Sequence, residues 1–321
     1  MAKAKTKEKA DQNPVARFNI MGLRKPAVIL SATLITISVI AILLRGLNLG
    51  IDFTGGYIVE AGFEQAADLP EIRNVLADGG FADAIVQHFG TTSEVLVRLA
   101  PAEGLTGAKV NTDIDRILGA AGQGDVTMRR VEFVGPQVGE ELREQGGLAV
   151  LFALAAIVVY VWLRFEKKFS VGSVFALVHD VIITVGFFAL TQINFDLSVL
   201  AAILAVIGYS LNDTIVVFDR IRENFRILRK KTPEQVMNVS INQTLSRTII
   251  TSLTTLLVLL ALFILGGESI RSFSVALIIG VVVGTYSSIY VASSAVLSLG
   301  ITRDDLMPVA KEGASELDEI P

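Results

Sequence analysis

Six apolar runs, each long enough to cross a lipid bilayer, constrain the fold of this chain more than any other feature. The first run, residues 26–44, contains 19 uncharged residues. A helix of that length measures about 28 Å, close to the bilayer hydrocarbon thickness of about 30 Å. The other runs cover residues 147–163, 170–190, 197–218, 248–265 and 273–299. The chain is 52% hydrophobic, so we predict a polytopic α-helical membrane protein with six transmembrane helices.

The first apolar run is predicted to stay attached to the rest of the chain. Arg45, Gly46 and Leu47 follow it directly and offer no small-residue cleavage site of the kind that ends a signal peptide. We therefore expect an uncleaved transmembrane helix over residues 26–45, preceded by a cytoplasmic N-terminal tail over residues 1–25.

The distribution of lysine and arginine predicts the orientation of the spans. Basic residues collect in the N-terminal tail and in the segments after the second and fourth spans. The short loops on the opposite side, residues 191–196 and 266–272, contain a single basic residue, Arg271. Basic loops stay on the cytoplasmic side. Both termini are therefore predicted to be cytoplasmic, and the segment between the first two spans is predicted to lie outside.

The segment over residues 46–146 has the composition of a soluble domain and an alternating pattern of strands and helices. Polar and apolar residues alternate in strands, and apolar residues recur every three or four positions in helices. The expected strands are 52–63, 82–89, 94–99 and 126–134, and the expected helices are 69–77 and 110–120. This βαββαβ order predicts a ferredoxin-like α+β domain on the periplasmic side.

Two glycines at the start of this domain invite a different interpretation, a phosphate-binding loop. Gly55 and Gly56 follow Thr54, but no Gly-Lys-Ser or Gly-Lys-Thr sequence comes after them. We expect these glycines to turn the chain out of the membrane and into the first strand. No nucleotide site is predicted, and the chain is expected not to be an enzyme.

The remaining polar segments are predicted to lie on the cytoplasmic side. Residues 147–300 contain spans two to six, and the loop 219–247 between spans four and five is charged. It is predicted to form an amphipathic helical hairpin at the inner membrane surface, with Ile221, Phe225 and Leu228 on its apolar side. A solvated connector is the alternative. The acidic tail, residues 301–321, is predicted to be disordered.

Composition limits the chemistry available to the chain. It contains no cysteine and two histidines, which excludes disulfides and thiolate metal sites and leaves too few imidazoles for a histidine metal cluster. We expect no cofactor, with protons as the coupling ion.

Acidic side chains inside the apolar runs are the candidate functional residues. An acid at the centre of a span costs about 2.5–3.5 kcal/mol on insertion scales, so it is retained with a partner or a function. Asp213 lies in the fourth span, with Tyr209 and Asn212 on the same helical face. Asp180 lies near the centre of the third span beside His179. That pair forms either a second functional site or a structural hydrogen bond between helices.

The fifth span offers a polar surface that matches Asp213. Arg247, Thr248, Thr251 and Thr255, preceded by Thr244, recur at helical spacing and predict one polar stripe. We expect Asp213 and Arg247 to meet there, either as a static ion pair or as a proton or ion site. A proton that moves down a membrane potential supplies about 2.3 kcal/mol per 100 mV, which favours the second interpretation.

The sixth span contains a seam of small residues. Gly280, Gly284, Ser288 and Ala292 recur at four-residue spacing. Small residues on one helical face let two membrane helices approach closely, so this seam predicts a tight helix contact.

Several long motifs occur in an order that is typical of one known family. They are residues 50–56 (GIDFTGG), 134–136 (VGP), 176–180 (ALVHD), 208–217 (GYSLNDTIVV), 219–224 (DRIREN) and 243–248 (QTLSRT). With these motifs the chain resembles the SecF branch of the SecD/SecF family of bacterial protein-export membrane proteins, within the resistance-nodulation-division superfamily. The resemblance covers roughly residues 20–300.

The resemblance implies a function and a set of partners. The expected role is an auxiliary subunit of the Sec export machinery in the bacterial inner membrane, which couples the proton motive force to late steps of preprotein translocation. The implied partners are SecD, the SecYEG channel, the motor SecA and, in some assemblies, YajC, with an unfolded preprotein as substrate. Asp213 would be the proton-responsive acid and Arg247 its basic partner. The alternatives are half of a proton-driven small-molecule efflux transporter and a scaffold that transports nothing.

Overall fold

The structure is a computed structural model that describes residues 17–101, 105–120, 125–302 and 304–306. Among these residues, six helices are long and apolar enough to span a membrane, which confirms the predicted number. The tail up to residue 16 and the segment from residue 307 lie outside the described residues, so the predictions for those tails stay predictions.

The six spans are built mostly from single long helices. They are α1 (Arg24–Arg45, after the 3-10 turn η1, Met21–Leu23), α5 (Pro136–Arg164), α6 (Lys167–Thr191), α7 (Leu197–Ile227), α8 (Pro233–Leu265) and a composite last span. That last span consists of α9 (Glu268–Tyr286), a π-helical segment η2 (Ser287–Ala292) and α10 (Ser293–Ser298), and the turn η3 (Asp304–Leu306) follows it.

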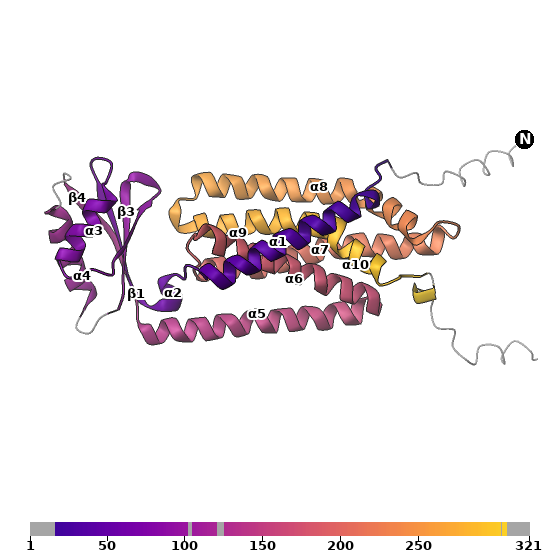
Figure 1. Cartoon of the computed structure of the whole chain (residues 1–321), viewed down its shortest axis with the longest axis horizontal. Helices are drawn as coiled ribbons and strands as arrows, with labels where there is room; N and C mark the ends of the chain where they lie inside the picture. The colour runs from indigo at the N-terminus through magenta and orange to yellow at the C-terminus, as the bar shows by residue number, and fades with distance from the viewer. Residues whose placement is uncertain (1–16, 102–104, 121–124, 303, 307–321) are drawn as a thin grey trace, which may run out of the picture.

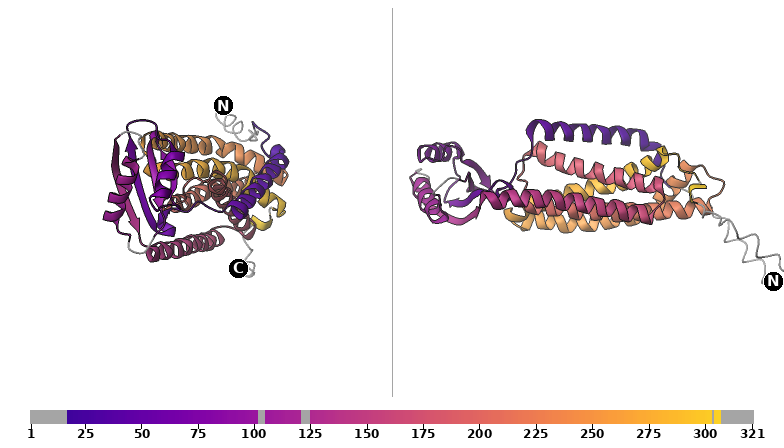
Figure 2. Two further views of the ribbon diagram at one scale, coloured as in Figure 1. Left: turned by 60° about the vertical axis from the view of Figure 1, so that its left-hand side comes forward. Right: turned by 90° about the horizontal axis from the view of Figure 1, so that it is seen from below.

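The spans form two groups according to burial. Helices α6 and α7 and the last span bury about half of their apolar windows inside the chain, whereas α1, α5 and α8 bury much less. Helix α1 packs on α6, and α8 packs on α7 and α9. In the right-hand view of Figure 2, α1 (indigo) lies along one edge of the bundle. The outward surfaces of α1, α5 and α8 therefore face lipid or a partner.

The inserted domain has the predicted ferredoxin-like topology. Its elements are β1 (Gly56–Phe63), α3 (Leu69–Asp78), β2 (Ile85–Phe89), β3 (Thr91–Leu99), α4 (Gly107–Gly119) and β4 (Val126–Val134). The sheet order is β2-β3-β1-β4 with antiparallel neighbours. In Figure 1 this domain lies beyond one end of the bundle, and α1 begins at the opposite end.

The alternation along β1 explains how the sheet is covered. Tyr57, Val59 and Ala61 point to the helices α3 and α4, where they join the buried core of the domain. Ile58 points to the other face and packs with Leu96 and Ile51. Figure 1 shows α3 and α4 on the side of the sheet away from the bundle. The sheet therefore presents its second face to the membrane part.

The start of the first strand differs from the prediction. Residues 52–54, expected as the start of a strand over 52–63, lie instead in a short helical turn, α2 (Ile51–Thr54). The chain then turns at Gly55 and Gly56, which have φ angles of +69° and +119°. A side chain at Gly56 would collide with the carbonyl oxygen of Leu99. These glycines are therefore required by the turn into β1, as the sequence indicated.

Two long helices extend beyond the apolar runs that predicted them. Helix α5 begins at Pro136, so residues 136–146, expected in the inserted domain, belong to this helix. The segment over 219–247 consists of the ends of α7 and α8 rather than a separate surface hairpin.

The apolar side of this segment does not face the membrane surface. Ile221, Phe225 and Leu228 are buried in the main core of the chain. Asn224 donates hydrogen bonds to Ser240 and Gln243 across the two helices. The predicted helical hairpin is present as the continuation of α7 and α8. Its predicted apolar contact with the membrane surface is wrong, because these apolar side chains pack α7 against its neighbours.

Arg98 connects the inserted domain to the bundle. It lies on β3, is 9% exposed, and donates hydrogen bonds from Nη1 to Asn48 Oδ1 (3.2 Å) and Leu49 O (2.9 Å). Its Nη2 donates to Asn194, in the loop between α6 and α7. Burial lowers the pKa of Arg98, and the nearby Asp196 opposes this effect. The guanidinium thus joins a strand, the linker after α1 and a loop of the bundle.

We expect the substitution Arg98→Met to loosen this junction. Methionine keeps the length of the apolar stem but removes all of these hydrogen bonds, and hydrogen bonds to a charged group contribute about 1.5–3 kcal/mol each. Hydrogen exchange should speed up at the Gly50 amide, which donates to Phe195 O across the same junction at 2.8 Å. Arg129→Met is the matched control, because Arg129 is an exposed arginine paired with Glu94 in the same domain. Equal exchange in both variants would contradict the proposed connection.

Candidate functional site

Asp213 lies at the meeting point of three spans. It is 8% exposed and belongs to α7. Thr248 of α8 donates a hydrogen bond from Oγ1 to Asp213 Oδ1 at 2.7 Å. Ser288 of the last span makes a short contact with Asp213 Oδ2. Two hydroxyl groups therefore surround the carboxyl group, and each comes from a different neighbouring helix.

The hydrogen bonds of Ser288 link Asp213 to the backbone of the last span. Ser288 Oγ also lies 3.0 Å from the carbonyl oxygen of Thr285, which can only accept. A serine hydroxyl has one hydrogen to donate, so this hydrogen either serves Asp213 and Thr285 together as a three-centre bond or turns to one of them. A protonated Asp213 can donate to Ser288, which then donates to Thr285 alone. Gain or loss of a proton at Asp213 would therefore change the hydrogen bond of Ser288 within its own helix.

Ser288 is the second residue of the π-helical segment η2. Wider π turns interrupt the regular backbone ladder of an α-helix and occur frequently at functional sites. Before η2, Gly280 and Gly284 face Val206 and Ser210 of α7 at close range. The small-residue seam is thus confirmed as a tight contact with α7. Ser288 continues this seam and reaches Asp213, a contact that the four-residue spacing alone did not reveal.

Arg247 does not pair with Asp213, so the predicted ion pair is wrong in this structure. Arg247 is exposed, and within the part of the chain that the structure describes it forms no salt bridge. Successive residues of an α-helix are rotated by about 100°. Because Thr244 and Thr248 face the interior, Arg247 points away from Asp213. Its predicted role in proton coupling is left to experiment.

Tyr209 and Asn212, predicted on the same helical face as Asp213, form no hydrogen bond with it in the part of the chain that the structure describes. Tyr209 donates to Ser252 Oγ at 3.3 Å, and Ser252 lies 2.7 Å from Thr285 Oγ1. Tyr209, Ser252 and Thr285 thus form a chain of hydroxyl groups. The backbone carbonyl oxygen of Thr285 is the one that Ser288 contacts. Asn212 is exposed.

The predicted polar stripe of α8 is divided between two faces. Thr248 is buried and points to α7, with Thr244 and Ser252 above and below it. Thr251 is exposed and Thr255 is half-buried. Both donate hydrogen bonds to backbone carbonyl oxygens of their own helix. The buried polar seam therefore runs through residues 244, 248 and 252, and Thr251 and Thr255 lie beside it.

The second candidate acid, Asp180, lies in α6 and is 1% exposed, as is His179. His179 Nδ1 lies 2.8 Å from Asp180 Oδ1. Ser210 of α7 donates to Asp180 Oδ2 at 2.5 Å. Ser210 lies about one helical turn before Asp213, so Asp180 of α6 contacts α7 beside the acid that α7 itself carries. Among the described residues no group of three metal-ligating side chains is present.

The fold and these sites define a class of protein. The chain is a six-span membrane protein with a ferredoxin-like domain at one end and protonatable acids, held by hydroxyl groups, inside the bundle. The family model for the C-terminal part of the protein export membrane proteins SecD and SecF matches residues 114–302. The model of the SecD/SecF GG motif matches residues 40–67. The chain belongs to the SecD/SecF family.

Characterised relatives agree with this assignment. The chain is 53% identical to the protein translocase subunit SecF of Vibrio alginolyticus, over 95% of this chain and 97% of the relative. It is 48% identical to SecF of Pseudomonas aeruginosa, over 92% and 95%.

A solved structure shares the fold. The crystal structure of SecDF, a translocon-associated membrane protein from Thermus thermophilus, matches with a TM-score of 0.80 and 40% identity. The match covers 88% of this chain but 38% of the SecDF chain. This chain therefore corresponds to a part of that longer protein.

Proposed function

We propose that this chain is an auxiliary subunit of the Sec protein-export machinery that couples proton movement to late steps of preprotein translocation across the bacterial inner membrane. The observation that carries the proposal is the placement of Asp213 between hydroxyl groups of α8 and the last span. Gain or loss of one proton there changes the hydrogen bonds of three helices at once. The relatives are translocase subunits, which favours export over small-molecule efflux.

The route from Asp213 to the outer domain runs along α7. The first residue of this helix, Leu197, donates its backbone N–H to Asp52 Oδ2 at 2.9 Å. Asp52 belongs to α2, directly before the glycine turn into β1. A movement of α7 would therefore be transmitted to the root of the ferredoxin-like domain, which in this proposal acts on the emerging preprotein.

The energy available is suited to such a change. A proton that crosses a membrane potential contributes about 2.3 kcal/mol per 100 mV. This is comparable to the few kcal/mol that separate two conformations of a protein when the minor state is detectably populated. The chain needs no ATPase site of its own for this role.

The exposed surfaces of the bundle and the longer SecDF relative support a SecD-type partner. The bundle leaves α1, α5 and α8 largely uncovered, and the longer SecDF chain contains segments that this chain lacks. We assign SecD to the uncovered bundle surface, and SecYEG, SecA and YajC to the wider assembly. The excess of basic residues at the end of the bundle away from the inserted domain supports cytoplasmic termini.

Reconstitution tests the proposal. Proteoliposomes that contain the translocation channel, its motor and the SecD-type partner are prepared with and without this chain, and export of a preprotein is timed with and without a proton gradient. The gradient should accelerate completion of export only when the chain is present. Equal acceleration in its absence would reject the proposal, and gradient-driven movement of a small hydrophobic dye instead of preprotein would support efflux.

A further inference from the structure

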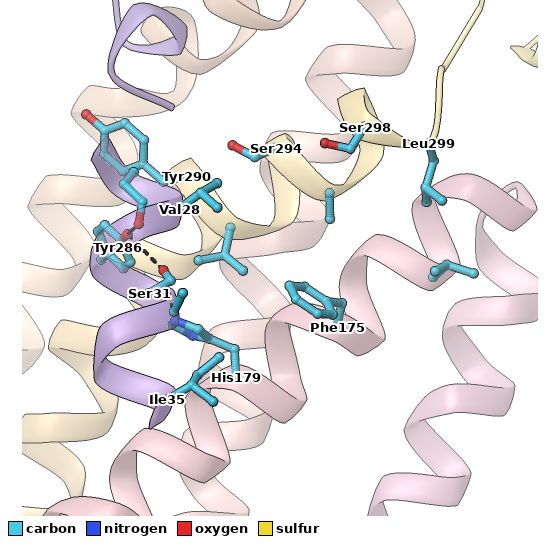
Figure 3. Close-up of a pocket in the computed structure, with 15 residues that line it drawn as sticks. Val28, Ser31, Ile35, Phe175, His179, Tyr286, Tyr290, Ser294, Ser298 and Leu299 are labelled. Carbon is cyan, nitrogen blue, oxygen red and sulfur yellow. Dashed lines mark hydrogen bonds between the residues drawn. The ribbon is translucent and has the colours of Figure 1, made fainter. Parts of the chain in front are cut away.

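A continuous chain of hydrogen bonds connects the buried pair His179 and Asp180 to the first and last spans. His179 Nε2 lies 3.2 Å from Ser31 Oγ of α1. Ser31 Oγ lies 2.9 Å from the hydroxyl oxygen of Tyr286, at the end of α9. Tyr286 in turn donates its hydrogen to the backbone carbonyl oxygen of Ala27 at 2.6 Å. Figure 3 shows Ser31 between His179 and Tyr286.

Counting the hydrogens along this chain determines how many protons the pair holds. A carbonyl oxygen only accepts, so the single phenolic hydrogen of Tyr286 is used on Ala27. Ser31 must then donate its own hydrogen to Tyr286. Because Ser31 has no second hydrogen, the contact between His179 and Ser31 requires a hydrogen on His179 Nε2.

The contact between His179 and Asp180 requires a further hydrogen. At 2.8 Å, a bare Nδ1 and an ionised carboxylate would face each other with lone pairs alone. Either Nδ1 also carries a hydrogen, which makes an imidazolium beside a carboxylate, or Asp180 is a carboxylic acid. Both arrangements hold two protons in the pair, and both are neutral overall.

Neutrality is what the surroundings of the pair favour. The titratable side chains that line the cavity beside the pair, apart from His179 itself, are Tyr286 and Tyr290 of the last span. Helix α7 contributes Ser210 and carries Asp213 about one turn further on, and α1 contributes the hydroxyl of Ser31. The charged residues of α1 (24, 25 and 45) and the other charged residues of α7 (from 219 onward) lie at the helix ends. In the part of the chain that the structure describes, no lysine or arginine forms an ion pair with Asp180. An uncompensated charge inside a bundle is costly.

Loss of one proton would change a contact between helices as well as a charge. In the one-proton state Nδ1 keeps its hydrogen against the carboxylate and Nε2 becomes an acceptor. Ser31 must then donate to His179, and its hydrogen bond to Tyr286 is lost. The protonation state of the pair would therefore change the contact between α1 and the last span. This contact, at Tyr286, lies directly before the π-helical segment that contains Ser288.

A cavity beside His179 extends toward the end of the bundle where α1 begins. It has a volume of about 420 Å³ and a mostly apolar lining that includes Val28, Ile35 and Phe175, and its polar groups come from Ser31, His179, Tyr286, Tyr290, Ser294 and Ser298. The hydroxyl of Ser294 is buried and has no hydrogen-bond partner among the described residues, so it is free to bind water or a proton carrier there. An adjoining hollow shares Ser294 and Ser298 and reaches Arg24 and Lys25.

We propose that His179 and Asp180 form a second proton-binding site, which holds two protons at neutral pH, exchanges one of them through this cavity, and controls the hydrogen bond between Ser31 and Tyr286. This inference concerns proton binding alone and goes beyond the proposed export function. It holds or fails in a measurement without export, so its failure is distinguishable from a failure of that function.

The chain is suited to a direct test because it contains only two histidines. The other, His88, is exposed on β2. Protein with ¹⁵N-labelled histidine is placed in phospholipid nanodiscs, the signals are assigned with His88→Gln, and the protonation of each ring nitrogen is followed by NMR between about pH 5 and pH 10. His88 serves as the internal reference for an exposed imidazole. His179 should carry a hydrogen on Nε2 at neutral pH and lose it in a separate step.

Two conservative variants test the connection to Tyr286. In Tyr286→Phe, Ser31 is free to donate to His179, so the ratio of unprotonated to protonated Nε2 at a fixed pH should rise about two- to tenfold, the effect of one net hydrogen bond. Tyr290→Phe removes a phenol hydroxyl from the same cavity but leaves the hydrogen bond between Ser31 and Tyr286 in place. The ratio of unprotonated to protonated Nε2 should therefore stay unchanged in this variant. Thermal unfolding confirms that both variants are folded.

Clear outcomes would overturn the proposal. One is a His179 with unprotonated Nε2 at neutral pH in the unmodified protein. Another is a His179 that shows no change over the whole pH range. A third is an equal response of the two tyrosine variants. The first two depend on no substitution near the pair, so a variant that misfolds does not remove the test.

Discussion

Asp213→Asn is expected to remove the acceleration of preprotein export by a proton gradient while leaving the bundle folded. Asparagine has the shape of the protonated carboxyl group. Its amide nitrogen can donate to Ser288 and its oxygen can accept from Thr248, the two contacts of Asp213. The variant therefore keeps the protonated arrangement but cannot release a proton. Export with the gradient should fall to the rate measured without it.

The control for this prediction lies on the same helix. Asp219→Asn changes an acid six residues further along α7, where the side chain is 42% exposed and paired with Arg164. Exposed ion pairs contribute about 0–1 kcal/mol, so this variant should keep its response to the gradient. The unfolding midpoint of Asp213→Asn in detergent should remain close to that of the unmodified chain. A full response to the gradient in Asp213→Asn would exclude Asp213 as the coupling site.

Gly280→Ala is expected to destabilise the bundle although alanine is the better helix former. A Cβ atom at position 280 would overlap the side chain of Val206 on α7. Overpacking of a well-packed interior costs about 1–3 kcal/mol. The last span must move away from α7, and this movement also draws Ser288 from Asp213. We expect a lower unfolding midpoint in detergent together with a weaker gradient response in export.

A second glycine separates packing from helix propensity. At Gly147 of α5, an added Cβ meets no atom within 4 Å. Gly147→Ala should therefore be neutral or stabilising, because alanine is favoured over glycine in a helix by about 1 kcal/mol. The unfolding midpoint should therefore fall in Gly280→Ala and stay the same or rise in Gly147→Ala. A midpoint that does not fall in Gly280→Ala would show that the contact between α7 and α9 is looser than the structure indicates.

Helix ends and side-chain partners were harder to predict than helices. The apolar run that begins at residue 147 was correct, but α5 starts at Pro136 because a helix continues into water wherever its backbone hydrogen bonds are satisfied. In the same way, Ile221 and Phe225 have an apolar periodicity that suits a membrane surface and a protein interior equally. Only the position of α8 decided that they are buried.

At the candidate site, the sequence likewise identified the acids but not the side chains that contact them. Asp213 was identifiable because an acid in an apolar run is costly, and Asp180 for the same reason. The partner of Asp213 was predicted incorrectly, since Arg247 and Thr248 are adjacent in sequence and a rotation of about 100° determines which of them faces α7. Ser288 was visible as a small residue in a seam, but its contact with the acid depends on how the last span packs against α7.

The sequence by itself determined the number of spans, the βαββαβ order of the inserted domain and the two acids inside the bundle. These features follow from hydrophobicity, period and the cost of burying charge, which are properties of short segments. Only the tertiary structure decided that Asp213 is held by Thr248 and Ser288, and that His179 reaches Tyr286 through Ser31. Those contacts join helices that are far apart in sequence, and they depend on helix rotation and spacing, which packing alone sets.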